Sequence, residues 1–197
     1  MKKIKAIHVL TALDRCGVYV FTKRDLEKAF PSEKEKAFEK SLQRLVADGI
    51  LQRVAKGVYL NPMAKSKKGQ VVEDIAAVLR RGHYSYVTLE SILSEYGIIS
   101  QVPVSRLTLM TTGASGLHDT PYGTIEFTHT KRSTAELIRR TVSVKGRSLR
   151  IATKAAAIAD LLRVGRNTTW FARMLKCSIK EVTYDALREK NNHRVAI

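Results

Sequence analysis

Apolar residues over the first 60 positions recur at the spacing of helices, and polar capping residues separate one run from the next. The first run predicts a helix over residues 2–14 that ends near Gly17. Its core-facing side is expected to carry Ile4, Ile7, Leu10 and Leu13. A short apolar link over 18–21, rich in β-prone residues, follows this helix.

Two further helices are predicted by their caps. Thr22 with Asp25, and Ser32 with Glu35, have the spacing of a capping box, in which each polar side chain satisfies a free backbone amide of the helix start. Pro31 stops the first of these helices, because proline cannot continue one. The helix after it is expected to end at a glycine, position 49, that can adopt a left-handed conformation.

The helix after Pro31 separates apolar from cationic residues. Its apolar side carries Phe38, Leu42, Leu45 and Val46. Its other side offers Lys36, Lys40, Gln43 and Arg44. Lysine and arginine neutralise phosphates, and arginine and glutamine also read base edges, so this side is a candidate DNA-binding surface. A merely solvated helix face is the ordinary alternative, and acidic residues weaken the case where they face DNA: Glu33, Glu35 and Glu39.

A hairpin with a cationic tip follows the third helix. Residues 50–54 and 58–60 predict two strands, and Gly57 suits the turn between them because it takes a positive φ without steric cost. Arg53 and Lys56 lie near the tip, and Lys23 and Arg24 at the start of the second helix are expected to contact flanking phosphates. Helix, turn, helix and hairpin together predict a winged helix–turn–helix, a module that binds DNA and in other cases docks proteins.

The second half of the chain predicts a mixed domain. The basic stretch AKSKKG marks a boundary between a winged-helix domain over 1–64 and a second domain over 69–197. The patterns predict helices over 70–81, 88–96, 153–164 and 180–190, strands over 106–112 and 125–128, a hairpin joining 142–144 to 149–151, and a loop over 113–123. Because no βαβ rhythm runs through these elements, the expected fold class is α+β.

Net charge narrows the choice of partner. The 197 residues include 35 lysines and arginines against 18 acidic residues, a formal charge of +17 that favours a polyanion as partner, with an anionic membrane surface as the competing interpretation. Twelve basic and two acidic residues lie between His129 and Lys176. A second basic surface is the sharper interpretation of this stretch, against solvated arginines or a dock for an acidic protein: Lys131, Arg132, Arg139, Arg140, Arg147, Arg163 and Arg166.

Two isolated cysteines predict free thiols in a reducing cytoplasm. No apolar run approaches the length of about 18 residues that a membrane span needs, so no membrane-spanning segment is predicted, and a polyanion rather than a membrane is the expected partner.

Candidate chemistry in the sequence is weak. Ser115, His118 and Asp119 lie together, but no nucleophile elbow surrounds the serine. His118 and His129 have no companions at metal-ligand spacing, and neither GxGxxG nor GKT/S occurs. We therefore expect no catalytic residues, no metal and no cofactor. A nuclease stays as a remote alternative, although the acids that it needs are scattered over different elements: Glu90, Glu95 and Glu126.

Several segments resemble a known family. KGVYL, YVTLESILSEYGII, LTLMTTG, GTIEFTHTKR and RIATKAAAIADLL are similar to AbiEi-type antitoxins of type IV abortive-infection toxin–antitoxin systems, over roughly residues 5–165. Lys154 and Ala155 stand where the family usually has a Pro-Glu pair.

The resemblance implies a non-enzymatic antitoxin with a winged helix that binds repeats in its own promoter and represses the operon. It also implies a second domain that opposes a nucleotidyltransferase toxin without needing a stable complex. No individual residue can be assigned to the antitoxic role. An RNA-binding module that protects an RNA target of the toxin is the alternative function.

Overall fold

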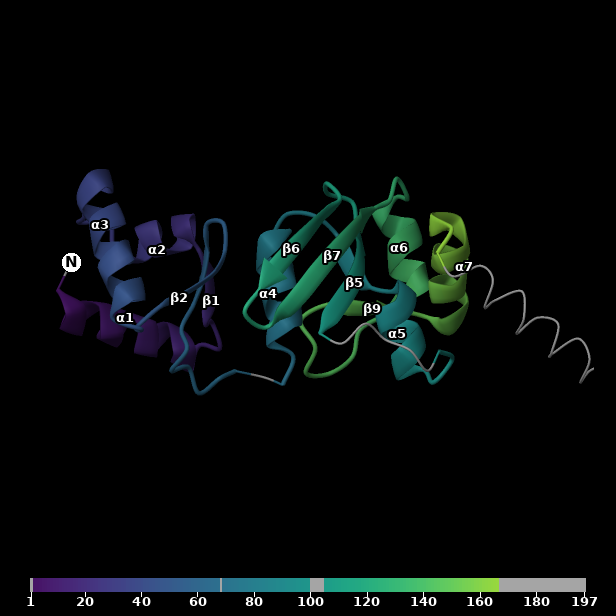
Figure 1. Ribbon diagram of the computed structural model, residues 1–197, viewed down its shortest axis with the longest axis horizontal. Helices are drawn as coiled ribbons and strands as arrows, with labels where there is room; N and C mark the ends of the chain where they lie inside the picture. Colours follow the sequence, from purple (N-terminus) through teal and green to yellow (C-terminus); the bar gives the residue numbers. More distant parts are fainter. Residues whose placement is uncertain (1, 68, 100–104, 167–197) are drawn as a thin grey trace, which may run out of the picture. The chain divides into compact units, whose positions relative to one another are not determined.

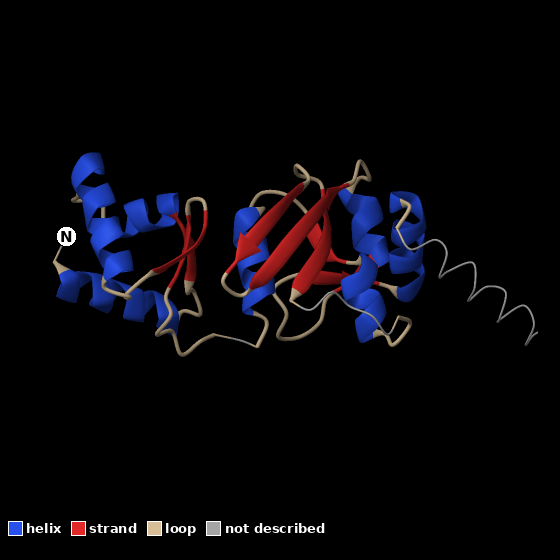
Figure 2. Cartoon of the chain, in the orientation of Figure 1, coloured by secondary structure: helices blue, strands red, loops and turns tan. Residues whose placement is uncertain are grey.

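The computed structural model describes residues 2–67, 69–99 and 105–166, which form an α+β protein with two β-sheets (Figures 1 and 2). Residues 1–157 make one compact unit and residues 158–197 a second. The helix expected over 180–190 lies outside the described residues. None of the helices in the described part of the chain is long and apolar enough to cross a membrane.

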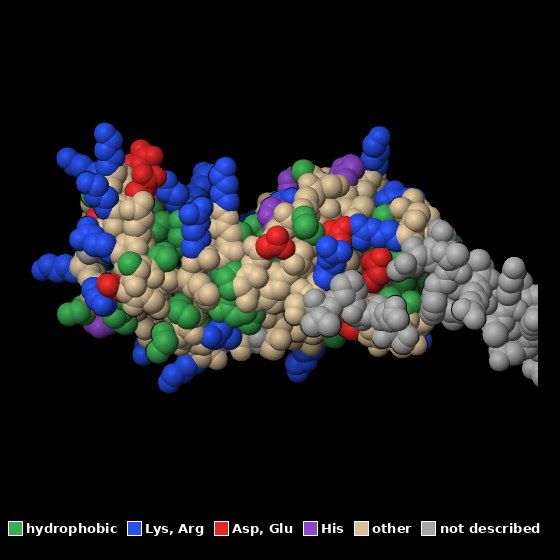
Figure 3. Space-filling model, in the orientation of Figure 1, with side chains coloured by type: hydrophobic (Ala, Val, Ile, Leu, Met, Phe, Trp, Pro, Cys, Tyr) green, Lys and Arg blue, Asp and Glu red, His purple; other side chains and the backbone are tan. Residues whose placement is uncertain are grey.

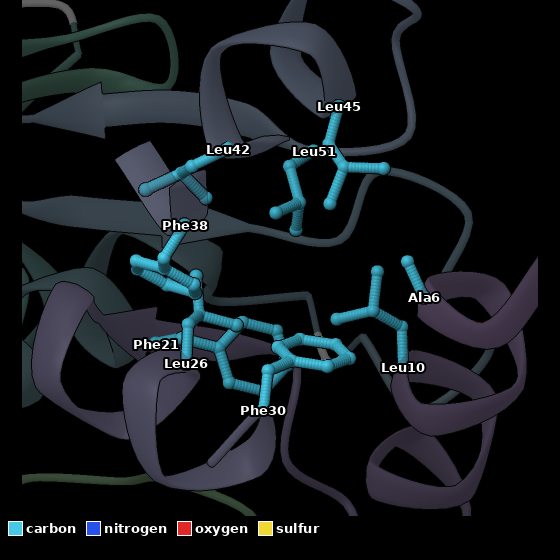
Figure 4. Close-up of a cluster of buried hydrophobic side chains, with 9 residues drawn as sticks. All are labelled: Ala6, Leu10, Phe21, Leu26, Phe30, Phe38, Leu42, Leu45 and Leu51. Carbon is cyan, nitrogen blue, oxygen red and sulfur yellow. The ribbon is translucent and has the colours of Figure 1, made fainter. Parts of the chain in front are cut away.

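The first 60 residues form three helices and a small antiparallel sheet with strand order β1-β3-β2. The elements are α1 (Lys3–Arg15), β1 (Val20–Thr22), α2 (Lys23–Ala29), α3 (Glu35–Ala47), β2 (Gln52–Ala55) and β3 (Val58–Leu60). The three helices and the adjoining strand segments enclose one hydrophobic core (Figure 4). Its buried members are Ala6, Leu10, Phe21, Leu26, Phe30, Phe38, Leu42, Leu45 and Leu51.

The buried face of α1 differs from the expected one. Ala6 and Leu10 are buried, whereas Ile4 and Ile7 are 70% and 43% exposed. The small Ala6 side chain lets α1 approach the core closely, so the helix is rotated away from the face that the isoleucines define.

One of the two predicted capping boxes forms. The Thr22 hydroxyl accepts a hydrogen bond from the Asp25 amide, and the Asp25 carboxylate accepts one from the Thr22 amide. The box predicted at Ser32 is wrong, because α3 begins only at Glu35 and no side chain caps it. The chain first makes a turn in which the Glu33 amide donates to the Phe30 carbonyl, and this turn delays the helix.

A six-stranded sheet with order β6-β7-β5-β4-β9-β8 organises the rest of the chain. Its elements are α4 (Val71–Leu79), β4 (Ser85–Val87), α5 (Leu89–Glu95), β5 (Arg106–Thr111), β6 (Gly116–Thr120), β7 (Gly123–His129), α6 (Thr134–Arg140), β8 (Thr141–Val142), β9 (Arg150–Ala152) and α7 (Lys154–Val164). The β5–β7 and β4–β9 pairs are parallel, and the other pairs are antiparallel.

Helices α4 and α5 cover opposite faces of this sheet (Figure 1). Thr108 on β5 points to α5, where its hydroxyl donates to the Thr88 carbonyl and accepts from the Ser91 amide. Successive strand residues face opposite sides, so Leu109 and its register partner Phe127 lie on the α4 side. The centre of the sheet is therefore buried on both faces.

One prediction for the second half is wrong, two elements (β4 and α6) were not predicted, and other predictions are confirmed. The segment expected as a loop over 113–123 contains β6, which pairs with β7 from Gly116 to Thr120. The hairpin joining β8 to β9 is confirmed, as is the helix after Thr153, whose hydroxyl accepts a hydrogen bond from the Ala156 amide. β6 has few strand-forming residues, so its pairing with β7 decides its structure rather than its own propensity.

Candidate nucleic-acid interface

The four polar residues predicted to face outward from α3 do so. Lys36, Lys40, Gln43 and Arg44 are all exposed, while Phe38, Leu42 and Leu45 on the other side are buried. Figure 3 shows lysine and arginine side chains projecting over α3 and over the β2–β3 hairpin. The helix is held by its apolar side and presents its cationic side to solvent.

In the part of the chain that the structure describes, no acidic side chain pairs with the cations on this side of α3. Among the described residues, Lys36, Lys40 and Arg44 form no ion pair, and the Arg44 Nε only donates to the Lys40 carbonyl one turn earlier, at 3.3 Å. Their charges are therefore available to a ligand. Glu35, one of the acidic residues that weaken the case for DNA binding, is exposed at the start of α3.

The hairpin is anchored next to α3. Gly57 has a φ of +73°, as the turn requires, and its carbonyl accepts a hydrogen bond of 2.8 Å from the Lys23 amide at the start of α2. Pairing of β3 with β1 fixes the other side of the hairpin. Arg53 and Lys56 are exposed, so the hairpin presents two cations from a braced support.

A hollow of about 350 Å³ lies between α3, the start of α2 and the hairpin. Its lining combines residues of all three elements: Lys23, Glu39, Leu42, Gln43, Val46, Arg53 and Tyr59. Polar and apolar groups therefore share the floor between the cationic helix and the cationic strand.

An ion pair restrains the acid closest to this hollow. Lys23 Nζ lies 2.6 Å from Glu39 Oε1 and 3.7 Å from Glu27 Oε1. The hydrogen bond to Glu39 raises the pKa of Lys23. The pair neutralises Glu39, which lessens its repulsion of DNA, and it also ties up Lys23, which was expected to contact phosphate directly. Arg24 is exposed and, among the described residues, has no ion-pair partner.

The start of α2 is also tied to the residues after α4. Arg81 Nη1 lies 2.7 Å from both carboxylate oxygens of Asp25. Burial raises the pKa of Asp25, but hydrogen bonds from the Thr22 amide and from Arg81 outweigh it and lower the pKa overall. Asp25 thus caps α2 and binds an arginine at the same time.

The second basic surface predicted from the sequence is not assembled as expected. Arg147 was expected on this surface, but its side chain is 8% exposed and lies between the carboxylates of Glu73 and Glu95. It therefore belongs to a buried ion network. Arg132 pairs with Glu136 at 3.0 Å, and Arg140 Nη2 donates to the Ala156 carbonyl.

The other members of that predicted surface are dispersed. Lys131 and Arg139 are exposed in the first unit, before and on α6. Arg163 and Arg166 belong to the second unit, the first exposed and the second half-buried. The density of arginines in the sequence therefore overstates the free positive charge here.

The Ser115, His118 and Asp119 side chains do not converge. His118 and Asp119 are successive residues of β6 and point to opposite faces of the sheet. Asp119 accepts a hydrogen bond from the Thr124 hydroxyl, and Ser115 accepts one from the His129 amide. Within the described ranges, no three histidine, cysteine or acidic side chains are grouped so that they could hold a metal ion.

Sequence reasoning missed a cluster around Arg80, which lies just after α4. Arg80 meets His118 and Phe127, and His83 and His129 lie against the loop that follows β5. These residues span about 50 positions, and no local pattern links them. The small-residue run TTGASG over 111–116 was the one available signal.

These elements define a strongly basic α+β protein in which a three-helix module with a cationic hairpin precedes a larger mixed sheet. The chain belongs to DUF6088, a family of unknown function, which it matches over residues 14–169. No curated protein matches the chain.

Proposed function

We propose that residues 1–64 form a winged helix–turn–helix domain that binds double-stranded DNA. The observation that carries the proposal is the unpaired cationic side of α3, which faces away from the core next to the braced hairpin. The major groove of B-DNA, about 12 Å wide, admits one helix. With α3 in the groove, the hairpin is the wing and lies on the adjoining phosphate backbone.

Each exposed residue has a defined role in this arrangement. Lys36 and Lys40 neutralise phosphates, and Gln43 and Arg44 meet base edges. Three further cations flank the groove on phosphates: Arg24, Arg53 and Lys56. Lys23 acts through Glu39, because the pair keeps that carboxylate from facing DNA as a free charge.

We further propose that the protein is a non-enzymatic antitoxin of the AbiEi type. It represses its own operon by binding repeats in the promoter, and it counteracts a nucleotidyltransferase toxin without a stable complex. The resemblance of five segments over roughly residues 5–165 supports this proposal, together with the DNA-binding geometry of α3. The cytoplasm is the compartment in which such a regulator meets its operator.

Binding to DNA from the region upstream of the gene tests the first proposal. If about six phosphates are neutralised, the logarithm of the association constant should fall with the logarithm of salt concentration at a slope of about −5. Lys40→Glu should weaken binding by at least about 100-fold, since juxtaposed like charges cost several kcal/mol. A salt-independent affinity contradicts the proposal.

Lys145→Glu is the matched control, because it reverses one exposed charge in the turn between β8 and β9. It should keep most of the affinity, and its circular dichroism spectrum should match those of the wild type and Lys40→Glu. Equal losses in the two variants would show that net charge, rather than α3, governs binding.

The antitoxin proposal has its own experiment. Co-expression with a nucleotidyltransferase encoded next to the gene should restore growth, and Lys40→Glu should abolish repression while it retains rescue. Failure of the wild-type protein to rescue refutes the antitoxic role but leaves DNA binding standing.

An RNA-binding module that protects the toxin's RNA target is the second candidate. The exposed Lys131 and Arg139, on the part of the chain outside the first three helices, favour it. Competition between operator DNA and a tRNA-like RNA separates the two functions. RNA that displaces DNA from the wild type, but binds Lys40→Glu undiminished, places the RNA contact outside α3.

A further inference from the structure

A half-buried arginine lies at the C-terminal end of α4. The Arg80 guanidinium carbon is 4.4 Å from the centre of the Phe127 ring, over its face. Its Nε donates to the Ala114 carbonyl at 3.2 Å, and its Nη2 lies 3.2 Å from His118 Nε2. Its Nη1 donates to the Leu79 carbonyl at 3.3 Å.

The sheet register brings these groups to one side. His118 pairs with Ile125 in the β6–β7 ladder, and Phe127 and His129 follow at intervals of two residues, so all of them face the side that α4 covers. Arg80 and His83 approach the same place from the end of α4. Figure 3 shows histidine side chains along the upper edge of this part of the molecule, near the upper ends of β6 and β7.

The charge of Arg80 has no counter-charge. Within the part of the chain that the structure describes, no carboxylate forms an ion pair with it, and its partners are two carbonyls and an imidazole. A guanidinium has five N–H donors, of which these contacts use three. A partly desolvated cation without an anion is unfavourable, so a bound anion would offset that cost and take up the remaining donors.

The state of His118 fits an adjacent anion site. Arginine only donates hydrogen bonds, so His118 Nε2 is the acceptor and its Nδ1 carries the hydrogen. Burial, and then the charge of Arg80, lower the pKa of His118. An anion beside both groups would reverse the electrostatic part of this effect and favour the imidazolium.

The loop after β5 leaves the cluster open. A Cβ on Gly113 would lie 2.9 Å from His83 Cγ, and one on Gly116 would lie 3.4 Å from both Arg80 Nη2 and His118 Nε2. A side chain at Gly113 would crowd the His83 ring, and one at Gly116 would lie against the Arg80 guanidinium and the His118 ring. Ser115 accepts the His129 amide hydrogen at 2.8 Å, which leaves its own hydroxyl hydrogen to donate.

We propose that Arg80 and His118, with Ser115 and the neighbouring His83 and His129, bind a phosphate group. Guanidinium, imidazole and hydroxyl donors together suit a tetrahedral oxyanion with several acceptor oxygens. The site binds the phosphate monoester of a nucleotide or of an RNA end. It is separate from α3 and does not depend on DNA binding.

Nuclear magnetic resonance of the histidine ring protons tests the site, with inorganic phosphate as the probe and chloride at equal ionic strength as the reference. Phosphate should raise the pKa of His118, whose signals are assigned with His118→Gln. Arg80→Lys keeps the charge but loses the planar fork, and it should weaken phosphate binding by about 10- to 150-fold.

Arg15→Ala is the control, because it removes one exposed arginine, in the last turn of α1, that has no role in either proposed binding site. It should bind phosphate as the wild type does. Two milder variants test the site if Arg80→Lys fails to fold. Ser115→Ala removes one donor from an exposed position, and Gly116→Ala places a methyl group against the guanidinium. Both should lower the affinity for phosphate.

Three results would overturn the site: no phosphate-specific change at His118, an equal response to chloride, or an equal loss of affinity in Arg15→Ala. Adenosine monophosphate and 5′-phosphorylated RNA, each compared with its unphosphorylated form, identify the source of the phosphate. Lys40→Glu should leave the phosphate response unchanged, so failure of the DNA-binding proposal and failure of this one are distinguishable.

Discussion

Removal of Arg147 tests whether this arginine serves the fold rather than a nucleic-acid surface. Its Nη1 lies 2.6 Å from Glu95 Oε2, its Nε lies 3.2 Å from Glu73 Oε2, and Nη2 contacts both carboxylates. The side chain of Glu73 is 4% exposed and that of Glu95 is 47% exposed. The loop before β9 is thereby joined to α4 and α5.

The cost of Arg147→Met follows from the burial of Glu73. Loss of one partner from a buried ion pair costs about 3–5 kcal/mol, because the other charge stays desolvated and uncompensated. For a chain of this length, that corresponds to a fall in melting temperature of roughly 6–20 °C at about 2–4 °C per kcal/mol. Glu95 contributes less, since water replaces its lost partner.

The double variant Arg147→Met, Glu73→Leu separates the cost of an unpaired buried charge from the cost of altered packing. Replacement of both charges by apolar groups of similar size is nearly neutral, so the second change should restore most of the stability that the first removes. Urea denaturation of the two single variants and the double variant gives the coupling energy. Arg147→Met should leave DNA affinity unchanged at temperatures where it is folded.

The loss in Arg147→Met should also depend on pH. Burial raises the pKa of Glu73, and the hydrogen bond and the charge of Arg147 oppose this rise. Without Arg147, the folded state binds a proton at Glu73 more tightly than the unfolded state does, so the destabilisation is full above the folded pKa and shrinks as the pH falls through it. A cost below about 1 kcal/mol, or no recovery in the double variant, would refute the reasoning.

Two further predictions concern single side chains. Thr22→Ala should cost about 1 kcal/mol in urea denaturation, because it removes the acceptor for the Asp25 amide, whereas Thr22→Ser should cost no more than a few tenths; equal costs would mean that the hydroxyl is not the cap. The lowered pKa of His118 means that the unfolded state binds more protons as the pH falls through its ordinary value of about 6.5, so acidification across that range should destabilise the wild type more than His118→Gln. Parallel pH–stability curves for these two proteins would contradict that assignment.

Elements built from nearby residues were predictable from the sequence. The cationic and apolar sides of α3 follow from its spacing alone, and the hairpin follows from two short apolar strands and Gly57. The Thr22 capping box is a contact between residues three apart, so its pattern is complete in the sequence.

Elements that depend on partners far along the chain were not predictable from the sequence. The orientation of α1 depends on how closely Ala6 packs, and the isoleucine spacing gives no information about that contact. β6 becomes a strand because β7 pairs with it, although Gly116 and Asp119 are poor strand formers. In both cases tertiary packing overrides the local preference.

Charge shows the same division between local and long-range information. The sequence gives the sign of Arg147, but its carboxylate partners Glu73 and Glu95 lie 74 and 52 positions away. Arg80 carries the same charge and is half-buried, yet it meets an imidazole and two carbonyls instead of a carboxylate. The formal charge of +17 counts both arginines alike, although two carboxylates pair with Arg147 and, among the described residues, none pairs with Arg80. The difference between their surroundings therefore arises only when the sheet and its helices have brought their partners together.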